Sequence, residues 1–284
     1  MRPPDESTSL DKYLGGDGRT VGDILAPLLL PPQAMRGSVL FVAAHPNDEV
    51  LGASWLMRRS PGCHVVHVTD GAPRDPSLRP EGAPPAREAY ARIREEEAFA
   101  ALGLAGVPRD NLFSLGAVDL EAAQDLATLT GCLVALIKAL RPALLVVHPY
   151  EGRHPDQDSA AFISHAAVAL LARAGRTPPV LLEMASEFLP APDGRPVATV
   201  AFTEAECATK RRMLACYASQ GRELQSFPVG CERYRAAPRY DFTRPPHEGA
   251  LEYEASGWRM TGARWRELAR AALETLRLPE APWH

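Results

Sequence analysis

The sequence lacks several features that would assign it to a class of protein at once. Its five cysteines are widely spaced and form no C-x-x-C pair, so neither a disulfide framework nor a thiolate zinc cluster is indicated. It also has no G-x-G-x-x-G after its first strand-like segment, no G-x-x-x-x-G-K-[ST] and no G-x-S-x-G. These absences argue against dinucleotide binding, phosphate-loop nucleotide binding and serine hydrolysis.

Charge of either sign is not in large excess. The formal net charge of the 284 residues is -4 and there is no basic block, which gives no reason to expect a nucleic-acid or anionic-membrane partner. Residues 1–16 lack the apolar core of a secretory signal, and the apolar run at 24–30 is short and broken by proline. We therefore expect a cytoplasmic protein, without a membrane span, that acts on a small molecule; the oligomeric state stays open.

Short apolar runs rich in β-branched residues alternate with longer segments of helical periodicity. The runs lie at 38–44, 64–69, 111–115, 143–148 and 180–184, and the helical segments lie at 87–104, 120–140 and 158–174. This alternation predicts an α/β protein with a Rossmann-like, mostly parallel sheet and helices on both faces. The proline- and glycine-rich stretch at 70–86 is expected to be a long loop that carries function.

The two ends of the chain differ from this central pattern. We divide the chain into a proline-rich N-terminal segment (1–37), a catalytic-type domain (38–220) and a C-terminal extension packed on the same domain (221–284). Helical patterns at 203–220 and 262–276 enclose residues 232–258, whose prolines and aromatic residues argue against a helix. We expect this stretch to be a strand-poor cover over the ligand crevice.

Polar side chains follow three of the strand-like runs. HPNDE at 45–49 follows the first run, Asp70 follows the second, and HPYEGRHPDQD at 148–158 follows the fourth. Open α/β sheets bind ligands outside the carboxyl ends of their strands. Taken singly, Asp48 or Asn47 could simply cap a helix and His45 could be a neutral core histidine. The repeated His-Pro pair at two strand ends favours a site in which both histidines converge on one ion.

The two polar segments resemble the signatures of a known family. AHPNDE at 44–49 resembles the A-H-P-D-D-E signature of the PIG-L/LmbE-like (GlcNAc-PI de-N-acetylase type) zinc-dependent N-deacetylases, and HPDQD at 154–158 resembles their second signature, H-P-D-H. The similarity extends over roughly residues 39–220. It implies a Rossmann-like sheet, a mononuclear zinc site and hydrolysis of an N-acetyl group on an amino-sugar-like small molecule.

The resemblance also implies a role for each matching position. His45 and Asp48 correspond to two retained zinc ligands, and His154 corresponds to the residue that supports the oxyanion. Two positions differ: Asn47 stands where the family has its general base, and Gln157 stands where it has the third zinc ligand. An amide cannot take the proton that a carboxylate takes. A carboxamide oxygen is also a weaker zinc ligand than imidazole. We therefore expect zinc to be held weakly, if at all.

Further residues are assigned by their position near these segments. Asp156 is a candidate catalytic residue, and Asp156, Asp158 or Glu49 could replace the missing base. We expect six further residues to bind the substrate, on the basis of their place at strand ends, in the loop before the second signature or in the family resemblance. They are Glu49, Asp70, Arg94, Asp119, Tyr150 and Arg153. Asp70 is equally ordinary as a turn residue, and Arg94 could belong to a solvated helix face.

Two functions stay open at this point. In one, the protein is a hydrolase with an altered metal and base site, which the retention of His45, Asp48 and His154 favours. In the other, it is a metal-free or non-hydrolytic member that binds a sugar-like ligand or runs a different reaction, which the joint loss at Asn47 and Gln157 favours. Both require His45, Asp48, His154 and Gln157 to converge in one crevice.

Overall fold

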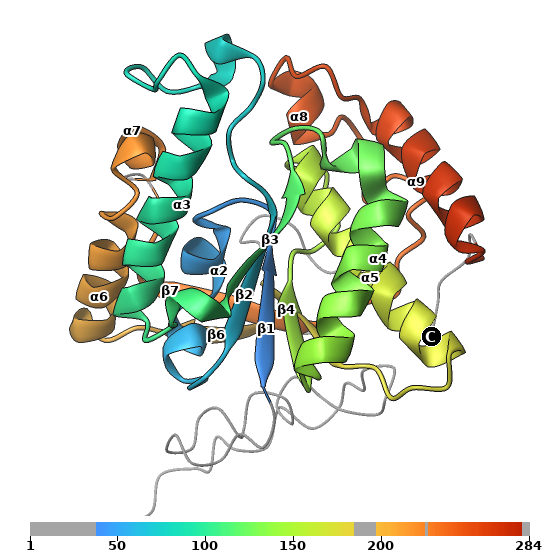
Figure 1. Ribbon diagram of the computed structural model, residues 1–284, viewed down its shortest axis with the longest axis horizontal. Helices are drawn as coiled ribbons and strands as arrows, with labels where there is room; N and C mark the ends of the chain where they lie inside the picture. Colours follow the sequence, from blue (N-terminus) through green and yellow to red (C-terminus); the bar gives the residue numbers. More distant parts are fainter. Residues whose placement is uncertain (1–37, 185–196, 225–226, 280–284) are drawn as a thin grey trace, which may run out of the picture.

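The computed structural model describes residues 38–184, 197–224 and 227–279. They form a seven-stranded sheet in the order β3-β2-β1-β4-β5-β7-β6 with helices on both faces (Figure 1). Five strands are parallel: β1 (Val39–Ala43), β2 (His64–Thr69), β3 (Leu112–Ala117), β4 (Leu144–Val147) and β5 (Val180–Met184). The prediction of a Rossmann-like, mostly parallel sheet is confirmed.

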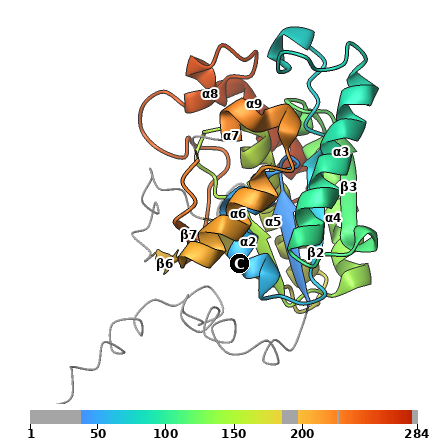
Figure 2. The ribbon, with the colours of Figure 1, turned by 90° about the vertical axis from the view of Figure 1, so that its left-hand side faces the viewer.

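Two layers of helices enclose this sheet. One layer contains α2 (Asp48–Arg58), α3 (Arg87–Leu104) and α6 (Glu204–Leu214), and Figure 2 shows α3 and α6 side by side. The other contains α4 (Leu126–Leu140), α5 (Pro155–Arg173) and α9 (Gly262–Leu276). Short helical turns complete the described chain: η2 (Pro76–Leu78), η3 (Arg109–Asn111), η4 (Ala122–Asp125), η5 (Ala218–Gln220), α7 (Gly221–Leu224) and α8 (Glu252–Ala255).

The central strands are apolar along their whole length because helices cover both of their sides. All five residues of β1 are buried. Leu40 and Val42 belong to the core on the α4 and α5 side, whereas Val39 and Phe41 belong to the core on the α2 and α3 side. Burying each such side chain contributes roughly 1.5–3 kcal/mol. This double burial holds the end of β1 in a fixed place.

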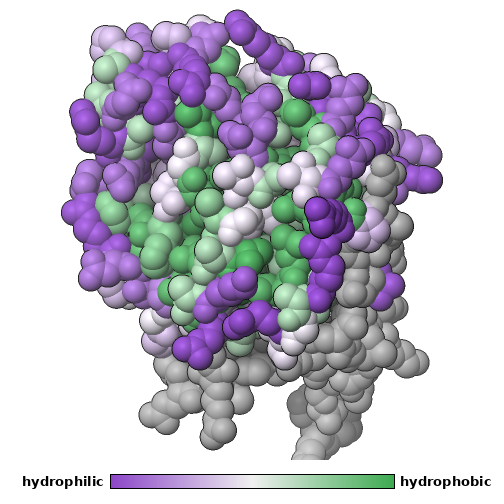
Figure 3. Space-filling view, turned by 45° about the vertical axis from the view of Figure 1, so that its right-hand side comes forward, coloured by the Kyte–Doolittle hydropathy of each residue, from purple (hydrophilic) through white to green (hydrophobic). Residues whose placement is uncertain are grey.

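One helical stretch among the described residues, 122–140, is long and apolar enough to cross a membrane by length and composition alone. Its residues Leu126, Leu129, Leu133 and Ile137 lie in the core, where α4 contacts α5 and α9. Apolar residues also gather among polar ones on this side of the molecular surface (Figure 3). α4 is therefore packed as a core helix. Core helices can also be long and apolar enough to meet this criterion of length and hydropathy.

The structure corrects the expectation for residues 232–258. This stretch contributes most of β7 (Cys231–Ala236), which lies antiparallel between β5 and β6 (Ala198–Ala201). The strand was missed because its sequence, CERYRA, is polar. Its charged side chains are buried against partners from distant segments, as when Arg235 donates to Glu183 across 2.5 Å. The N-terminal segment, 1–37, lies outside the described residues.

The strand order reverses between β1 and β4, and this switch point creates a crevice at their carboxyl ends. The loop at 70–86 and the segment around α8 both lie at this end of the molecule (Figure 1). Leu78 and Pro80 from the loop line the crevice together with Glu252 and Trp258 from the C-terminal extension. Part of the extension therefore does cover the crevice.

Candidate active site

The crevice encloses a cavity of about 800 Å³. This volume suits a small molecule of sugar-like size. Its polar wall comes from three strand ends: His45, Asn47 and Asp48 follow β1, Asp119 follows β3, and the segment after β4 adds His148, Arg153, His154 and Gln157. The structure thus brings together His45, Asp48, His154 and Gln157, as the two signatures require.

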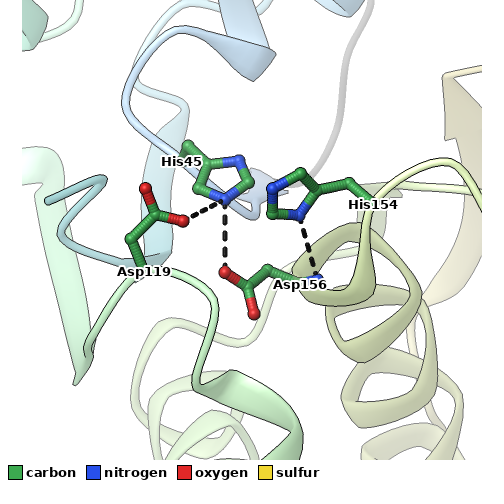
Figure 4. A group of neighbouring side chains, drawn as sticks. All are labelled: His45, Asp119, His154 and Asp156. Carbon is green, nitrogen blue, oxygen red and sulfur yellow. Dashed lines mark hydrogen bonds and ion pairs between the residues drawn. The ribbon is translucent and has the colours of Figure 1, made fainter. Parts of the chain in front are cut away.

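His45 lies at the centre of the site, with carboxylates on both sides of its ring. Nδ1 lies 3.1 Å from Asp48 Oδ2. Nε2 lies 3.1 Å from Asp119 Oδ1 and 3.3 Å from Asp156 Oδ2 (Figure 4). Burial alone would lower the pKa of His45, but Asp119 and Asp48 outweigh it and hold that pKa well above its ordinary value. Both ring nitrogens thus face carboxylate oxygens, which favours the charged, doubly protonated form of the ring.

Asp48 and Gln157 contact each other directly. The Gln157 side-chain amide donates from Nε2 to Asp48 Oδ1 across 3.1 Å, and the backbone N–H of His45 donates to Asp48 Oδ2 across 2.8 Å. His148 Nε2 lies 3.4 Å from the same Oδ2. Both carboxylate oxygens of Asp48 thus face N–H donors, and Gln157 presents its donor atom. In this arrangement Gln157 presents its N–H donor, and not its carbonyl oxygen, to Asp48, so its side chain is not oriented as a zinc ligand.

His154 is the N-cap residue of α5 and has a fixed tautomer. Its Nδ1 accepts the backbone N–H of Asp156 at 3.1 Å, so the proton lies on Nε2. Its ring packs edge-on against His45 and Trp258, with centroid distances of 4.4 and 4.5 Å. Burial, and then the charge of His45, lower the pKa of His154 to about 3. His154 is thus a neutral N–H donor at the cavity wall.

Asp156 and Asp119 differ although both contact His45. Asp156 is fully buried and accepts the backbone N–H groups of Leu120 and Ala122, at 2.6 and 3.2 Å. Burial raises the pKa of Asp156 to about 6. Burial would also raise the pKa of Asp119, but His45 holds it well below its usual range. Asp119 lines the cavity, whereas Asp156 lies behind His45 and orients it.

Asn47 has an unusual backbone conformation. Its φ of 128° lies in the region that favours glycine, which is a local strain of the kind that concentrates at functional sites. Its backbone N–H donates to Glu49 Oε2 at 3.3 Å, and its side chain makes no capping hydrogen bond to α2. Asn47 thus occupies the N-cap position of α2 without capping the helix through its side chain, and it lines the cavity.

Three of the proposed substrate-binding residues do not line the cavity. Glu49 is wholly buried and accepts from Tyr217 Oη at 2.7 Å, and its Oε2 lies 3.1 Å from His67 Nε2. Tyr150 donates from Oη to the carbonyl of Arg244 and packs among the core aromatic residues. Asp70 pairs with Arg87 and accepts the N–H of Ala72. Their contacts support the wall of the cavity.

Arg94, Arg153 and Asp158 do line the cavity, each with a partner. Arg94 donates to the carbonyls of Gly71 and Pro46, at 2.8 and 2.6 Å, and so ties two loops together. Arg153 pairs with Glu252 at 3.0 Å. Asp158 accepts two backbone N–H groups, from residues 151 and 152, and burial raises its pKa to about 8. A carboxyl group with that pKa is mostly protonated at neutral pH, which makes it a poor base there.

Sequence reasoning did not single out several residues of the wall, among them His148 and Trp258. His148 opens the segment 148–158, and its Nε2 accepts the backbone N–H of Ala44 at 3.1 Å. A histidine at the end of β4 was a signal that could have found it. Trp258 comes from the C-terminal extension, and nothing in its local sequence indicates contact with His154. Only the packing of the extension brings it there.

Comparisons with known proteins agree with this description. Residues 40–168 match the family model of the GlcNAc-PI de-N-acetylases, PIG-L. The resemblance predicted from the two signatures is thereby confirmed. No curated protein sequence matches the chain.

Several solved structures share the fold at low sequence identity. The N,N'-diacetylchitobiose deacetylase of Pyrococcus horikoshii is 19% identical, with a TM-score of 0.55 over 76% of this chain and 90% of that one. A deacetylase of the teicoplanin biosynthesis pathway is 16% identical, with a TM-score of 0.55 over 72% and 99%. GalB, the 4-carboxy-2-hydroxymuconate hydratase of Pseudomonas putida, is 16% identical, with a TM-score of 0.54 over 72% and 98%.

Proposed function

Because residues 40–168 of this chain belong to the PIG-L family, we propose that the protein is an amide hydrolase that removes an N-acyl group, such as acetyl, from an amino-sugar-like small molecule. The observation that carries the proposal is the cavity at the ends of β1 and β4. There, a neutral N–H donor, His154, lies beside an imidazolium, His45, and an ionised carboxylate, Asp119. Two deacetylases with the same fold support the reaction class.

The His154 side chain supplies the stabilisation of the tetrahedral intermediate in this proposal. Its Nε2–H donates to the amide carbonyl oxygen, which gains negative charge as water adds to the carbonyl carbon. Because Nδ1 is held by the N–H of Asp156, the donor does not have to reorient during the reaction. A preorganised donor of this kind contributes about 10²–10³ in rate.

His45 and Asp119 act as the general acid and the general base in this proposal. Asp119 accepts a proton from the attacking water, and His45 gives its Nε2 proton to the amine as the C–N bond breaks. The low pKa of Asp119 makes it a weak base, so turnover is expected to be slow compared with an enzyme that has aspartate at position 47. Asp156 acts through His45, because it fixes the ring from behind.

The substrate class follows from the wall of the cavity. Trp258 offers an apolar ring next to His154, which suits the apolar face of a sugar ring. Asp119 and Arg153 present polar groups that match sugar hydroxyls. A cytoplasmic location belongs to the same proposal and is supported by five cysteines that are all free thiols.

The test is to assay the unmodified protein and restored variants on N-acetylglucosamine and related acylated amino sugars. We expect slow hydrolysis by the parent. The double variant Asn47→Asp with Gln157→His should be about 10²-fold faster or more, because it regains a matched base and an imidazole ligand. Each single restoration should gain much less. Absence of hydrolysis by both the parent and the double variant would contradict the proposal.

A second candidate is a metal-free protein that binds its ligand without hydrolysing it, or that runs a different reaction. The contact of Gln157 with Asp48 favours it, because this contact occupies the lone pairs that the inherited zinc site would use. The likeness to a hydratase shows that this fold is not confined to deacetylases. Saturable binding of an acylated amino sugar, without hydrolysis by parent or double variant, would favour this candidate.

A further inference from the structure

The outward side of α4 carries almost no charge. One side of this helix packs in the core, and only 33% of its most apolar 18-residue window is buried. Lys138 is the single charged residue of its sequence, LATLTGCLVALIKAL. The exposed side consists of residues at spacings of three and four, which places them on one side of the helix. These residues are called the α4 face: Thr128, Gly131, Cys132, Ala135 and Ala139.

Other exposed helix faces of the molecule carry charged residues. α3 exposes Arg92, Glu95 and Glu96, and α9 exposes Arg264 and Glu267. Figure 3 shows apolar and near-neutral residues, in green and white, gathered over the side of the molecule where α4 lies and bordered by hydrophilic ones in purple. Contiguous apolar surface on a soluble protein is typical of an interaction site. The α4 face is therefore a candidate interface.

Gly131 gives a second, independent indication. It lies in the interior of α4, where glycine costs roughly 0.5–1 kcal/mol relative to alanine. A Cβ atom added there would meet nothing within 4 Å among the described residues, whereas a Cβ atom at Gly52 in α2 would lie 2.6 Å from the sulfur of Met184. The packing of a single chain thus explains Gly52 but not Gly131. Glycine on an open helix face permits the close approach of another backbone.

The charges at the two ends of α4 suit a second copy of the same helix. Asp125 directly precedes the helix and Lys138 lies in its last turn, and both side chains are exposed. In an antiparallel pair related by a two-fold axis, Asp125 of each copy faces Lys138 of the other. A parallel pair would bring like charges together. We infer that the α4 face is a homodimer interface in which two copies of α4 pack antiparallel.

The centre of this interface lies between Gly131 and Cys132. That point is midway between Asp125 and Lys138, so the two-fold axis passes beside it. Thr128 of one copy then faces Ala135 of the other. Because the side chains at these positions are small, the two helix axes can approach to about 8 Å, the lower end of the range for packed helices.

The strand β3 extends the uncharged surface. It is an edge strand of the sheet, it contacts α4, and it lies on the same side of the molecule (Figure 1). Its sequence, LFSLGA, has neither charge nor proline, and Ser114 and Gly116 are exposed. Edge strands usually carry such residues to prevent pairing. A membrane fits this surface less well than a second copy, since helices that lie on membranes are rich in lysine and arginine.

The first experiment is sedimentation velocity of the full chain over a range of concentrations. A helix pair about 22 Å long is at the small end of specific interfaces, so we expect a monomer–dimer equilibrium with a micromolar dissociation constant. Gly131→Glu should weaken dimerisation by more than about tenfold, because it places two carboxylates beside the axis. Ala100→Glu, at an exposed position of α3, is the matched control and should dimerise like the parent.

Gly131→Glu is expected to leave the single chain folded. The position is open, and glutamate favours a helix more than glycine does. Urea denaturation at low protein concentration should therefore show a variant at least as stable as the parent. Weaker dimerisation together with unchanged or higher stability separates an interface role from a structural one.

The second experiment uses Cys132, which is exposed and lies beside the proposed axis, whereas the other cysteines are buried or half-buried. A short bismaleimide should join two copies through this thiol, and Cys132→Ser should lose the cross-link. An unchanged cross-link in Cys132→Ser would overturn the inference, because the copies would then meet at another surface.

Three results of sedimentation would also overturn it. They are a monomer at every concentration up to the millimolar range, a dimer that Gly131→Glu does not weaken, and a monomer that binds phosphatidylcholine vesicles, which would assign the α4 face to a membrane surface. Since none of these experiments uses a substrate, their failure is distinct from failure of the proposed hydrolysis.

Discussion

Two buried clusters of charged side chains lie close to the crevice and are built on opposite principles. The crevice cluster consists of His45, Asp119, His154 and Asp156 (Figure 4). The Glu232 cluster consists of four residues that meet around one carboxylate, namely Ser54, Lys210, Glu232 and Tyr234. Both are assembled from segments far apart in the sequence, so distance along the chain does not distinguish them.

The two clusters differ in how completely their polar and charged groups have hydrogen-bond and ionic partners. Glu232 receives hydrogen bonds from Ser54 at 2.6 Å and Tyr234 at 2.6 Å, and it pairs with Lys210 at 2.9 Å. The Lys210 ammonium also donates to the carbonyl of Leu51. One negative and one positive charge are thus fully partnered, which is the signature of a structural network.

The crevice cluster has an excess of acceptors and strongly displaced pKa values. Two carboxylates share one imidazolium nitrogen, and the pKa values of His45 and Asp156 are raised while those of Asp119 and His154 are lowered. Such opposed shifts in neighbouring groups are typical of catalytic or metal-binding sites. The comparison indicates that incomplete satisfaction, and not burial of charge as such, marks the functional cluster. Four variants test it.

The largest effect is expected from Lys210→Met in the Glu232 cluster. The change leaves Glu232 buried without its counter-charge, which costs about 3–5 kcal/mol of unfolding free energy. Urea denaturation measures the loss. Arg74→Met, which breaks the exposed pair with Glu121, is the control and should cost less than about 1 kcal/mol. Equal losses of unfolding free energy in the two variants would contradict a structural role for the Glu232 cluster.

The second effect concerns the crevice cluster and is a loss of rate. His154→Phe keeps a ring between His45 and Trp258 but removes the N–H donor, so kcat should fall by about 10²–10³-fold with little change in KM. Steady-state kinetics on an N-acetyl amino sugar provides the measurement. His247→Phe, a change at a half-buried residue that does not line the cavity, should leave both constants unchanged. A fall confined to KM would place His154 in substrate binding alone.

The third effect is a pH dependence of stability at Glu183, a carboxylate with fewer partners than Glu232. Burial, despite the opposing charge of Arg235, raises its pKa to about 7. The folded state thus holds a proton that the unfolded chain releases near pH 4.5, so this group's contribution is fully present below about pH 4.5 and is lost as pH rises to about 7.

Glu183→Gln should remove this slope. We expect the unfolding free energy of the parent to fall by about 1–3 kcal/mol more than that of the variant between pH 4.5 and 7.5. Urea titrations at several pH values measure both slopes. Parallel curves would mean that Arg235 keeps Glu183 ionised throughout.

The smallest effect is expected at Trp258, at the edge of the crevice cluster. Trp258→Ala removes the ring that packs against His154, and KM for a sugar substrate should rise by roughly tenfold, which is about 1.4 kcal/mol of binding. Trp258→Phe keeps an aromatic face and should recover most of the affinity. If both variants raise KM equally, the indole contributes something other than a stacking surface.

Much of the fold could be predicted because these helices and strands depend on local residue patterns. The strands at 64–69 and 180–184 and the helix at 87–104 have the predicted bounds. The apolar runs of these strands and the helical periodicity of the helix indicate directly which faces are buried. By contrast, β7 is polar in sequence, and only its ion pairs with Lys210 and Glu183 make its burial possible.

The candidate site divides in the same way. The His-Pro segments after β1 and β4 identified His45, Asp48, His154 and Gln157, because parallel strands end at one edge of a sheet. Sequence could not predict that Glu49 and Tyr150 are turned into the core, or that Trp258 packs on His154. Side-chain direction and long-range packing decide these points.

The sequence by itself determined the mostly parallel sheet with helices on both faces, the location of the crevice and the chemical identity of its groups, including the amides at positions 47 and 157. Tertiary structure alone decided which atoms of those groups face each other. Gln157 donates to Asp48, while Asp119, from a third strand end, joins His45 on its other nitrogen. The reason is physical: residue types and local periodicity are written along the chain, but hydrogen-bond direction and charge pairing between distant segments arise only when packing fixes the side chains in space.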